Sequence, residues 1–223
     1  MMLEIPKVLS SEQLASVTKM LAGAKFVDGK LSAGSRAGTV KHNQELDPNN
    51  ADTDTLNELV VGNLFRHPVF QSAVLPARLS SAFFVRYSPG MAYGDHIDDP
   101  VMGDGNRYRS DVAITIFLND PQSYDGGELE VRTAFGEQAV KLAAGNALAY
   151  PASSLHRVRE VSRGERLVAV AWAQSLVRDV ARRELLYELD VARQALMRVT
   201  PKAEVTENID RVYANLVRMW AEP

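Results

Sequence analysis

Short alternating strands separated by tight turns are the feature that most constrains how this chain can fold. From Leu79 onward, apolar and polar residues alternate in brief runs, and turns such as Asp125-Gly126-Gly127 and Ala144-Gly145-Asn146 divide them. This spacing is typical of a sandwich or barrel. We therefore predict a mainly β fold, a double-stranded β-helix (jelly roll). The expected strands are 82–87, 112–118, 129–132, 139–142, 147–150 and 167–172.

Helices are expected on both sides of the strand-rich region. Ser10-Ser11-Glu12-Gln13 predicts a capping box that opens a helix ending at Gly23, and residues 53–65 predict a second helix. After Gln174, apolar residues recur at helical spacing in two stretches separated by Thr200-Pro201. We divide the chain into an N-terminal helical and extended segment that braces the core, the core itself, and a C-terminal helical extension, which are residues 1–77, 78–176 and 177–223.

The C-terminal helical pair has two interpretations. We favour packing of the pair on the barrel, and the alternative is a homodimer interface formed by these helices. Arg178, Arg182 and Arg183 fall in the first of the two stretches. Charged residues grouped on one helix usually form its solvated face, and we assign these three arginines to such a face.

Three potential metal ligands lie in the strand-rich region. His96 and Asp98 flank Ile97, and alternate residues of an extended segment point to the same side, so both side chains can hold one ion. His156 lies in a loop-like segment and can enter from a different strand. Two imidazoles and one carboxylate form the ligand set of non-haem Fe(II) with open positions. The alternative is that a short His-x-Asp motif occurs by chance on a surface.

Arg166 opens a strongly apolar run and shares one face with Val168, Val170 and Trp172. Burying an unpaired guanidinium is costly. Its planar fork suits a carboxylate, so a dicarboxylate co-substrate held at one end by iron and at the other by Arg166 would satisfy both groups. The alternatives are that Arg166 reaches solvent, or that it pairs with Asp99, Asp111 or Glu165.

Composition narrows the possible functions. The chain has no cysteine, so a metal site must use nitrogen and oxygen ligands. The net charge is −3 and no long basic stripe is present, which argues against sequence-independent nucleic-acid binding. No segment reaches the roughly 18 apolar residues of a membrane span, and residues 1–6 lack the basic start of a signal peptide. We expect a cytoplasmic protein with neither nucleic-acid nor membrane partners.

These motifs together resemble the prolyl 4-hydroxylase-like branch of the Fe(II)/2-oxoglutarate dioxygenases, and most closely the bacterial PKHD-type hydroxylases. The resemblance extends to the segments 26–30 and 41–44, so it covers most of the chain. The motifs that carry it are Tyr87 with Pro89-Gly90, His96-x-Asp98, Gly126-Gly127-Glu128-Leu129, His156 and Arg166.

The resemblance implies a role for each site residue. His96, Asp98 and His156 would bind Fe(II) as the catalytic centre, Arg166 would bind the distal carboxylate of 2-oxoglutarate, and Tyr87 would hydrogen-bond the same co-substrate. By the same resemblance Trp172 lines the pocket, with a core position as the alternative. Phe117 stands where some relatives have a tyrosine near the co-substrate, so a hydroxyl contact from that position is absent.

The implied activity is oxidative decarboxylation of 2-oxoglutarate, with dioxygen, coupled to hydroxylation of a primary substrate that the sequence does not identify. We expect residues 99–109 and the polar segment near His42 to select that substrate, and L-ascorbate is a candidate reductant for the iron. His42 and His67 are expected to be structural or solvent-facing. The alternatives are a cupin-like metalloenzyme that does not use 2-oxoglutarate and a non-catalytic jelly-roll binding protein.

Overall fold

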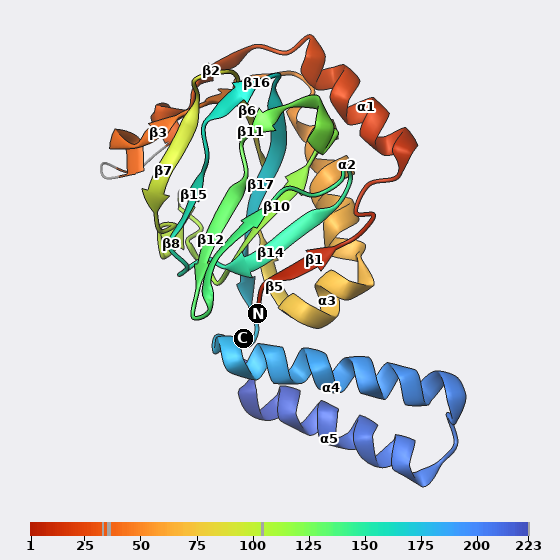
Figure 1. Ribbon diagram of the computed structural model, residues 1–223. Helices are drawn as coiled ribbons and strands as arrows, with labels where there is room; N and C mark the ends of the chain where they lie inside the picture. The colour runs from red at the N-terminus through yellow and green to blue at the C-terminus, as the bar shows by residue number, and fades with distance from the viewer. Residues whose placement is uncertain (33, 35–36, 104, 223) are drawn as a thin grey trace.

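Two antiparallel sheets face each other and form a double-stranded β-helix (Figure 1). The computed structural model describes residues 1–32, 34, 37–103 and 105–222. The larger sheet has eight strands, in the order β1 (Leu3–Ile5), β14 (Ala147–Pro151), β10 (Val112–Phe117), β17 (Arg166–Ser175), β6 (Phe83–Tyr87), β4 (Gln44–Leu46) and β2 (Phe26–Asp28), with β5 (Pro76–Leu79) also paired to β17. The smaller sheet has five strands, in the order β13 (Gly136–Val140), β12 (Leu129–Thr133), β15 (His156–Val158), β7 (Ala92–His96) and β3 (Lys41–His42).

Two short antiparallel strand pairs complete the strands, and both lie outside the two main sheets. They are β8 (Val101–Met102) with β9 (Tyr108–Arg109), and β11 (Asp125–Gly126) with β16 (Val161–Arg163). The expected strands are present with shifted ends, and the largest shift is in β13. Most of the strands that the sequence did not predict have only two to five residues, which is too short for alternation to give a clear signal.

Strand β17 shows how alternating side chains build two cores. Leu167 and Ala169 face the helices and belong to a core between the larger sheet and α1–α3. Val168 points the other way, into the space between the two sheets, where it joins Val85 and Val131. Successive residues of a strand point to opposite faces, so the even-numbered residues of β17 are directed toward the interior of the barrel.

Three helices cover the outer face of the larger sheet, and they are α1 (Ser11–Ala22), α2 (Thr53–Arg66) and α3 (Pro68–Val74) (Figure 1). The predicted capping box is present: the Gln13 amide donates to the Ser10 hydroxyl, and the Ser10 amide donates to the Gln13 side chain. Gly23 follows the last turn of α1, as expected. Helix α3 was not predicted, because its seven residues give too little periodicity.

The C-terminal helices α4 (Val180–Val199) and α5 (Glu204–Trp220) form the predicted helical pair, and they run antiparallel (Figure 1). Helix α4 packs against α3, where the Ser72 hydroxyl donates to the Asp190 carboxylate. Away from that contact the pair extends beyond the sheets (Figure 1). The expectation that the pair packs on the barrel is therefore only partly right. Among the described residues, no helix is long and apolar enough to cross a membrane.

The assignment of Arg183 to a solvated helix face was wrong. Its side chain is buried, and its guanidinium donates to the carbonyl oxygens of Val177 and Arg178, just before α4. These two hydrogen bonds satisfy carbonyls that precede the helix, so Arg183 joins the end of the barrel to α4. Arg178 and Arg182 are exposed, as expected, and Arg182 lies over the ring of Trp220.

Candidate active site

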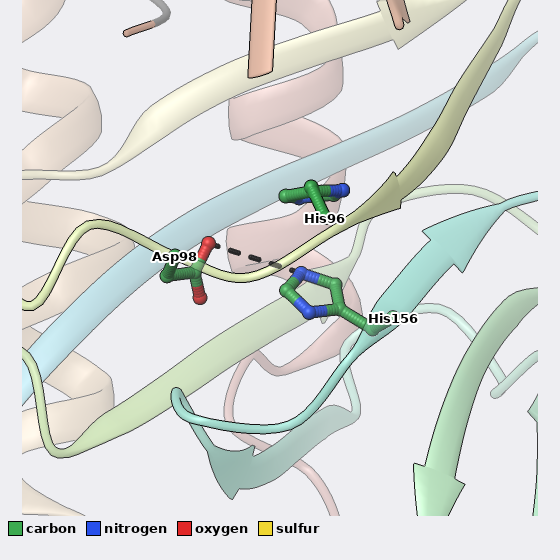
Figure 2. A group of neighbouring side chains, drawn as sticks. All are labelled: His96, Asp98 and His156. Atoms are coloured by element: carbon green, nitrogen blue, oxygen red, sulfur yellow. Dashed lines mark ion pairs between the residues drawn. The ribbon is translucent and has the colours of Figure 1, made fainter. Parts of the chain in front are cut away.

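Three potential metal ligands meet at the ends of β7 and β15, two neighbouring strands inside the smaller sheet (Figure 2). His96 and His156 lie directly opposite each other on the neighbouring strands β7 and β15. Strand β7 ends at His96, so Asp98 lies in the following loop. The sequence predicted a position for it on the same extended segment as His96. The loop still turns the carboxylate toward the two imidazoles, and one ligand atom from each residue lies within 4.8 Å of the others. The sequence predicted that strand ends from two sheets bring these ligands and Arg166 together, and both histidines come from the smaller sheet while Arg166 begins β17 of the larger one.

Backbone contacts fix the orientation of both imidazoles. The Nδ1 of His96 lies 2.8 Å from the Gly94 carbonyl oxygen, and the Nδ1 of His156 lies 2.9 Å from that of Ser154. A neutral imidazole that donates from Nδ1 keeps its lone pair on Nε2, the atom that then faces the centre. The Nε2 of His156 lies 3.8 Å from Oδ1 of Asp98. The two rings therefore present metal-binding atoms toward one carboxylate.

Burial sets the charges at this centre. It lowers the pKa of His96 to about 3, with the neighbouring His156 adding to the effect, so the His96 imidazole is neutral near pH 7. Burial also raises the pKa of Asp98. The Oδ2 atom of Asp98 is buried and has no hydrogen-bond partner. A buried carboxylate with an unpaired oxygen beside two imidazoles fits a divalent cation, which would compensate the buried negative charge.

A cavity of about 1050 Å³ joins the three candidate ligands to Arg166. Arg166 begins β17 on the facing sheet and is only 1% exposed. Its Nε has no hydrogen-bond partner, and its guanidinium lies 5.0 Å from the centre of the Tyr87 ring and 5.7 Å from that of Phe117. A buried cation is thus held between two aromatic rings at the inner end of the cavity.

The acidic partners considered for Arg166 are engaged elsewhere or too far away. Asp111 forms an ion pair with Arg109, and Glu165 lies 3.6 Å from Arg86. Asp99 lines the same cavity but forms no ion pair with Arg166. Within the described part of the chain, no carboxylate lies within ion-pair distance of this guanidinium. Arg166 is also too buried to reach solvent, so its charge needs an anion from outside the chain.

Tyr87 and Trp172 both lie in this cavity. Tyr87 is the cross-strand partner of Arg166 between β6 and β17, and its hydroxyl accepts a 2.9 Å hydrogen bond from the side-chain amide of Asn43. Trp172 lines the cavity and also packs against the core between the two sheets, so both interpretations of this residue hold. Phe117 is buried beside Arg166 and brings no hydroxyl to this place.

Sequence reasoning missed two residues that contact the proposed site. The ring of Tyr93 stacks on the His96 imidazole with centres 3.6 Å apart, and Asn43 binds the Tyr87 hydroxyl. The segment 41–44 carried part of the family resemblance, but a short motif does not indicate which of its side chains enters a cavity. His42 and His67 each contact a backbone carbonyl, of Gly90 and Pro6 respectively.

Four exposed large hydrophobic residues line the cavity and mark its outer end. These residues are Leu31, Phe83, Ile97 and Val101. The loop 99–109, expected to select the substrate, supplies several lining residues, which include Asp99, Met102, Arg107 and Tyr108. Asp104 in this loop and residues 33, 35 and 36 in the polar segment lie outside the described residues. Apolar side chains gathered at the mouth of a cavity are typical of a ligand site.

Comparison with known proteins agrees with this geometry. Residues 82–174 match the model of the 2OG-Fe(II) oxygenase superfamily, and residues 181–222 match that of the PKHD-type hydroxylase C-terminal domain. A PKHD-type hydroxylase of Thioalkalivibrio sulfidiphilus is 58% identical over 223 residues, covering 100% of both chains. Another, from Acaryochloris marina, is 49% identical over 222 residues, again covering 100% of both chains.

Solved structures share the fold at much lower sequence identity. A prolyl hydroxylase from Trichoplax adhaerens, solved with a peptide fragment of the hypoxia inducible factor oxygen degradation domain, aligns with a TM-score of 0.56 and 17% identity. The match covers 77% of this chain and 82% of that one. At this identity the likeness extends to the double-stranded β-helix alone.

Proposed function

This chain belongs to the PKHD-type hydroxylases of the 2OG-Fe(II) oxygenase superfamily, and from that premise we propose that it couples oxidative decarboxylation of 2-oxoglutarate to hydroxylation of a primary substrate. The family makes the protein a 2-oxoglutarate-dependent dioxygenase that uses Fe(II), 2-oxoglutarate and dioxygen. Membership in it removes the two alternatives, a cupin-like enzyme without 2-oxoglutarate and a non-catalytic binding protein.

The unpaired guanidinium of Arg166 is the observation that carries this proposal. It is buried in the same cavity as the three candidate metal ligands and has no carboxylate partner among the described residues. A dicarboxylate would supply the missing anion through a bidentate contact. We assign the distal carboxylate of 2-oxoglutarate to Arg166, with a hydrogen bond from the Tyr87 hydroxyl.

His96, Asp98 and His156 are the proposed Fe(II) ligands and form the proposed catalytic centre. Three protein ligands leave coordination positions open for other molecules. Bound Fe(II) and 2-oxoglutarate would supply the oxidising chemistry that yields succinate, carbon dioxide and a hydroxylated product. The chain's own residues hold the two imidazoles in place, balance charge with one carboxylate and anchor the far end of the co-substrate.

The outer end of the cavity is the proposed site of the primary substrate. Its exposed apolar residues, defined above, favour a substrate that presents an apolar group there, and the loop 99–109 would contact it. We also propose the cytoplasm as the location, because its reducing conditions favour ferrous iron. L-ascorbate is proposed as an auxiliary reductant for iron that becomes oxidised.

An anaerobic titration of Fe(II)-loaded protein with 2-oxoglutarate tests the proposed site. Chelation of the oxo acid by iron should give a visible charge-transfer band, and Arg166→Ala should need about tenfold or more co-substrate to reach the same band, because it loses an ionic contact. His156→Ala should lose stoichiometric iron and turnover. Full iron-dependent turnover in His156→Ala would overturn the ligand assignment, and unchanged co-substrate affinity in Arg166→Ala would overturn the role of Arg166.

A further inference from the structure

The hydroxyl of Tyr87 has one defined partner, the side chain of Asn43. Asn43 lies between β3 and β4, where the chain passes from the smaller sheet to the larger one. It is 3% exposed, and its Nδ2 donates to the Tyr87 oxygen at 2.9 Å. This contact connects an N-terminal crossing segment to the inner end of the cavity.

The side-chain amide of Asn43 packs directly against Gly29. Its Oδ1 is buried without a hydrogen-bond partner, and a Cβ built on Gly29 would lie 1.8 Å from it. The Gly29 amide also donates to the Asn43 backbone oxygen at 3.0 Å. Nδ2 is therefore the amide atom that faces Tyr87, and Oδ1 is the one that faces Gly29.

The direction of the hydrogen bond from Asn43 to Tyr87 determines how the Tyr87 hydroxyl can act. A phenol that accepts a hydrogen bond from Asn43 does not use its own proton in that contact. No acceptor for the Tyr87 proton is present among the described side chains. Burial raises the pKa of Tyr87, so the hydroxyl stays protonated. The proton is therefore free to point into the cavity, where Arg166 lies beside the same ring.

We propose that Asn43 is a positioning residue that makes Tyr87 a hydrogen-bond donor to the carboxylate of bound 2-oxoglutarate. The proposal rests on the function proposed above, which puts that carboxylate at Arg166. Asn43 itself does not touch the co-substrate. Gly29 takes part indirectly, because only a residue without a Cβ leaves room for the Asn43 amide.

Asn43→Asp tests the direction of this hydrogen bond with almost no change in the shape of the side chain. The ionised carboxylate that this substitution introduces would accept the Tyr87 proton, so the hydroxyl could no longer donate to 2-oxoglutarate. In the anaerobic titration at pH 8 we expect the dissociation constant for 2-oxoglutarate to rise about tenfold or more, as for loss of a hydrogen bond to a charged group. Iron binding without the co-substrate should be unchanged. Asn63→Asp, the same substitution in α2 away from the cavity, should leave both values unchanged.

The Tyr87→Phe background separates this effect from simple charge repulsion. If Asn43 acts through the hydroxyl, Asn43→Asp should weaken co-substrate binding no further once Tyr87 is Phe. An equal loss in both backgrounds would mean that the new carboxylate repels 2-oxoglutarate directly, which would overturn the proposal. Unchanged affinity of Asn43→Asp for 2-oxoglutarate would also overturn the proposal. That result would mean that the Tyr87 hydroxyl already donates to Asn43 in the wild-type protein and so is not available to the co-substrate.

Gly29→Ala gives a second test that adds no charge. Its Cβ would displace the Asn43 amide, so 2-oxoglutarate should bind more weakly while iron binding is retained. Normal co-substrate binding by folded Gly29→Ala would contradict the role of the Asn43 orientation. Failure of this proposal is distinguishable from failure of the proposed function: if Arg166→Ala weakens 2-oxoglutarate binding and Asn43→Asp does not, only the role of Asn43 is wrong.

Discussion

The imidazole of His96 lies largely out of water and beside a second imidazole, that of His156. Both conditions oppose protonation, and together they lower the pKa of His96 to about 3. The unfolded chain has no such environment, so there His96 titrates near its ordinary value of 6.5. A difference in pKa between the folded and unfolded states makes stability depend on pH.

The metal-free protein should therefore lose stability as the pH falls from about 6.5 toward 3. In this range the unfolded chain binds a proton at His96 and the folded protein does not, which favours unfolding by at most about 1.4 kcal/mol per pH unit. Asp98, whose pKa is raised by burial, acts in the opposite direction. Urea unfolding of chelator-treated protein at several pH values measures how steeply the free energy of unfolding changes with pH. His96→Gln should make this pH dependence shallower. An identical pH dependence in the two proteins would contradict the assignment of the effect to His96.

At the scale of the elements, local signals predict ends and faces well when an element is long. Helix α1 has a capping box, one apolar face and a terminal glycine, and the sequence predicted it nearly residue by residue. Strand β17 was predicted from its apolar run, and its alternation correctly assigned Arg166, Val170 and Trp172 to one face. The two-residue strand β3 gave no such signal, although it positions Asn43.

Ser10→Ala should destabilise the protein by about 1 kcal/mol, because the first amides of α1 lose their side-chain acceptor. For a chain of this size we expect the melting temperature to fall by about 2–4 °C. Thermal unfolding followed by circular dichroism measures it. Ser11→Ala, at the first residue of the helix, is the matched control and should change the melting temperature little. Equal effects of the two substitutions would mean that the cap contributes nothing.

At the scale of the whole molecule, the C-terminal pair presents apolar surface that the chain itself does not cover. Val205, Val212 and Met219 recur every seven residues along α5 and are exposed, so they share one face. Helix α5 is acidic at its start, with Glu204, and basic at its end, with Arg218. We propose a homodimer in which two α5 helices pack antiparallel, since this arrangement brings opposite charges together.

Size-exclusion chromatography with light scattering should then give twice the mass of the 24.5 kDa chain. Val212→Glu should shift the protein to a monomer, because the pairing would bury a charge at its centre. Ala214→Glu adds the same charge on a different face of α5 and should leave the dimer intact. A wild-type monomer at micromolar concentration would contradict the dimer. The division at residue 177 stays a proposal, in which the extension serves association and the core serves chemistry.

The sequence by itself determined the composition of the proposed site and the type of fold. The His96-x-Asp98 triplet, His156 and the apolar run after Arg166 indicated the ligand types, and alternation indicated the sheets. These properties depend on residue type and on spacing within a few residues, which the chain carries locally. The sequence could not choose between a dicarboxylate co-substrate and three acidic residues of the chain as the partner of Arg166, because ion pairing depends on distance in space.

Only the tertiary structure decided which side chains meet. Pairing of β7 with β15 set His96 opposite His156, and pairing of β6 with β17 set Tyr87 opposite Arg166. These contacts join residues far apart in the chain, and their register follows from packing of the whole barrel. The same packing left Arg166 without a carboxylate and turned Asn43 toward Tyr87. Such contacts need a folded core, so no local pattern contains them.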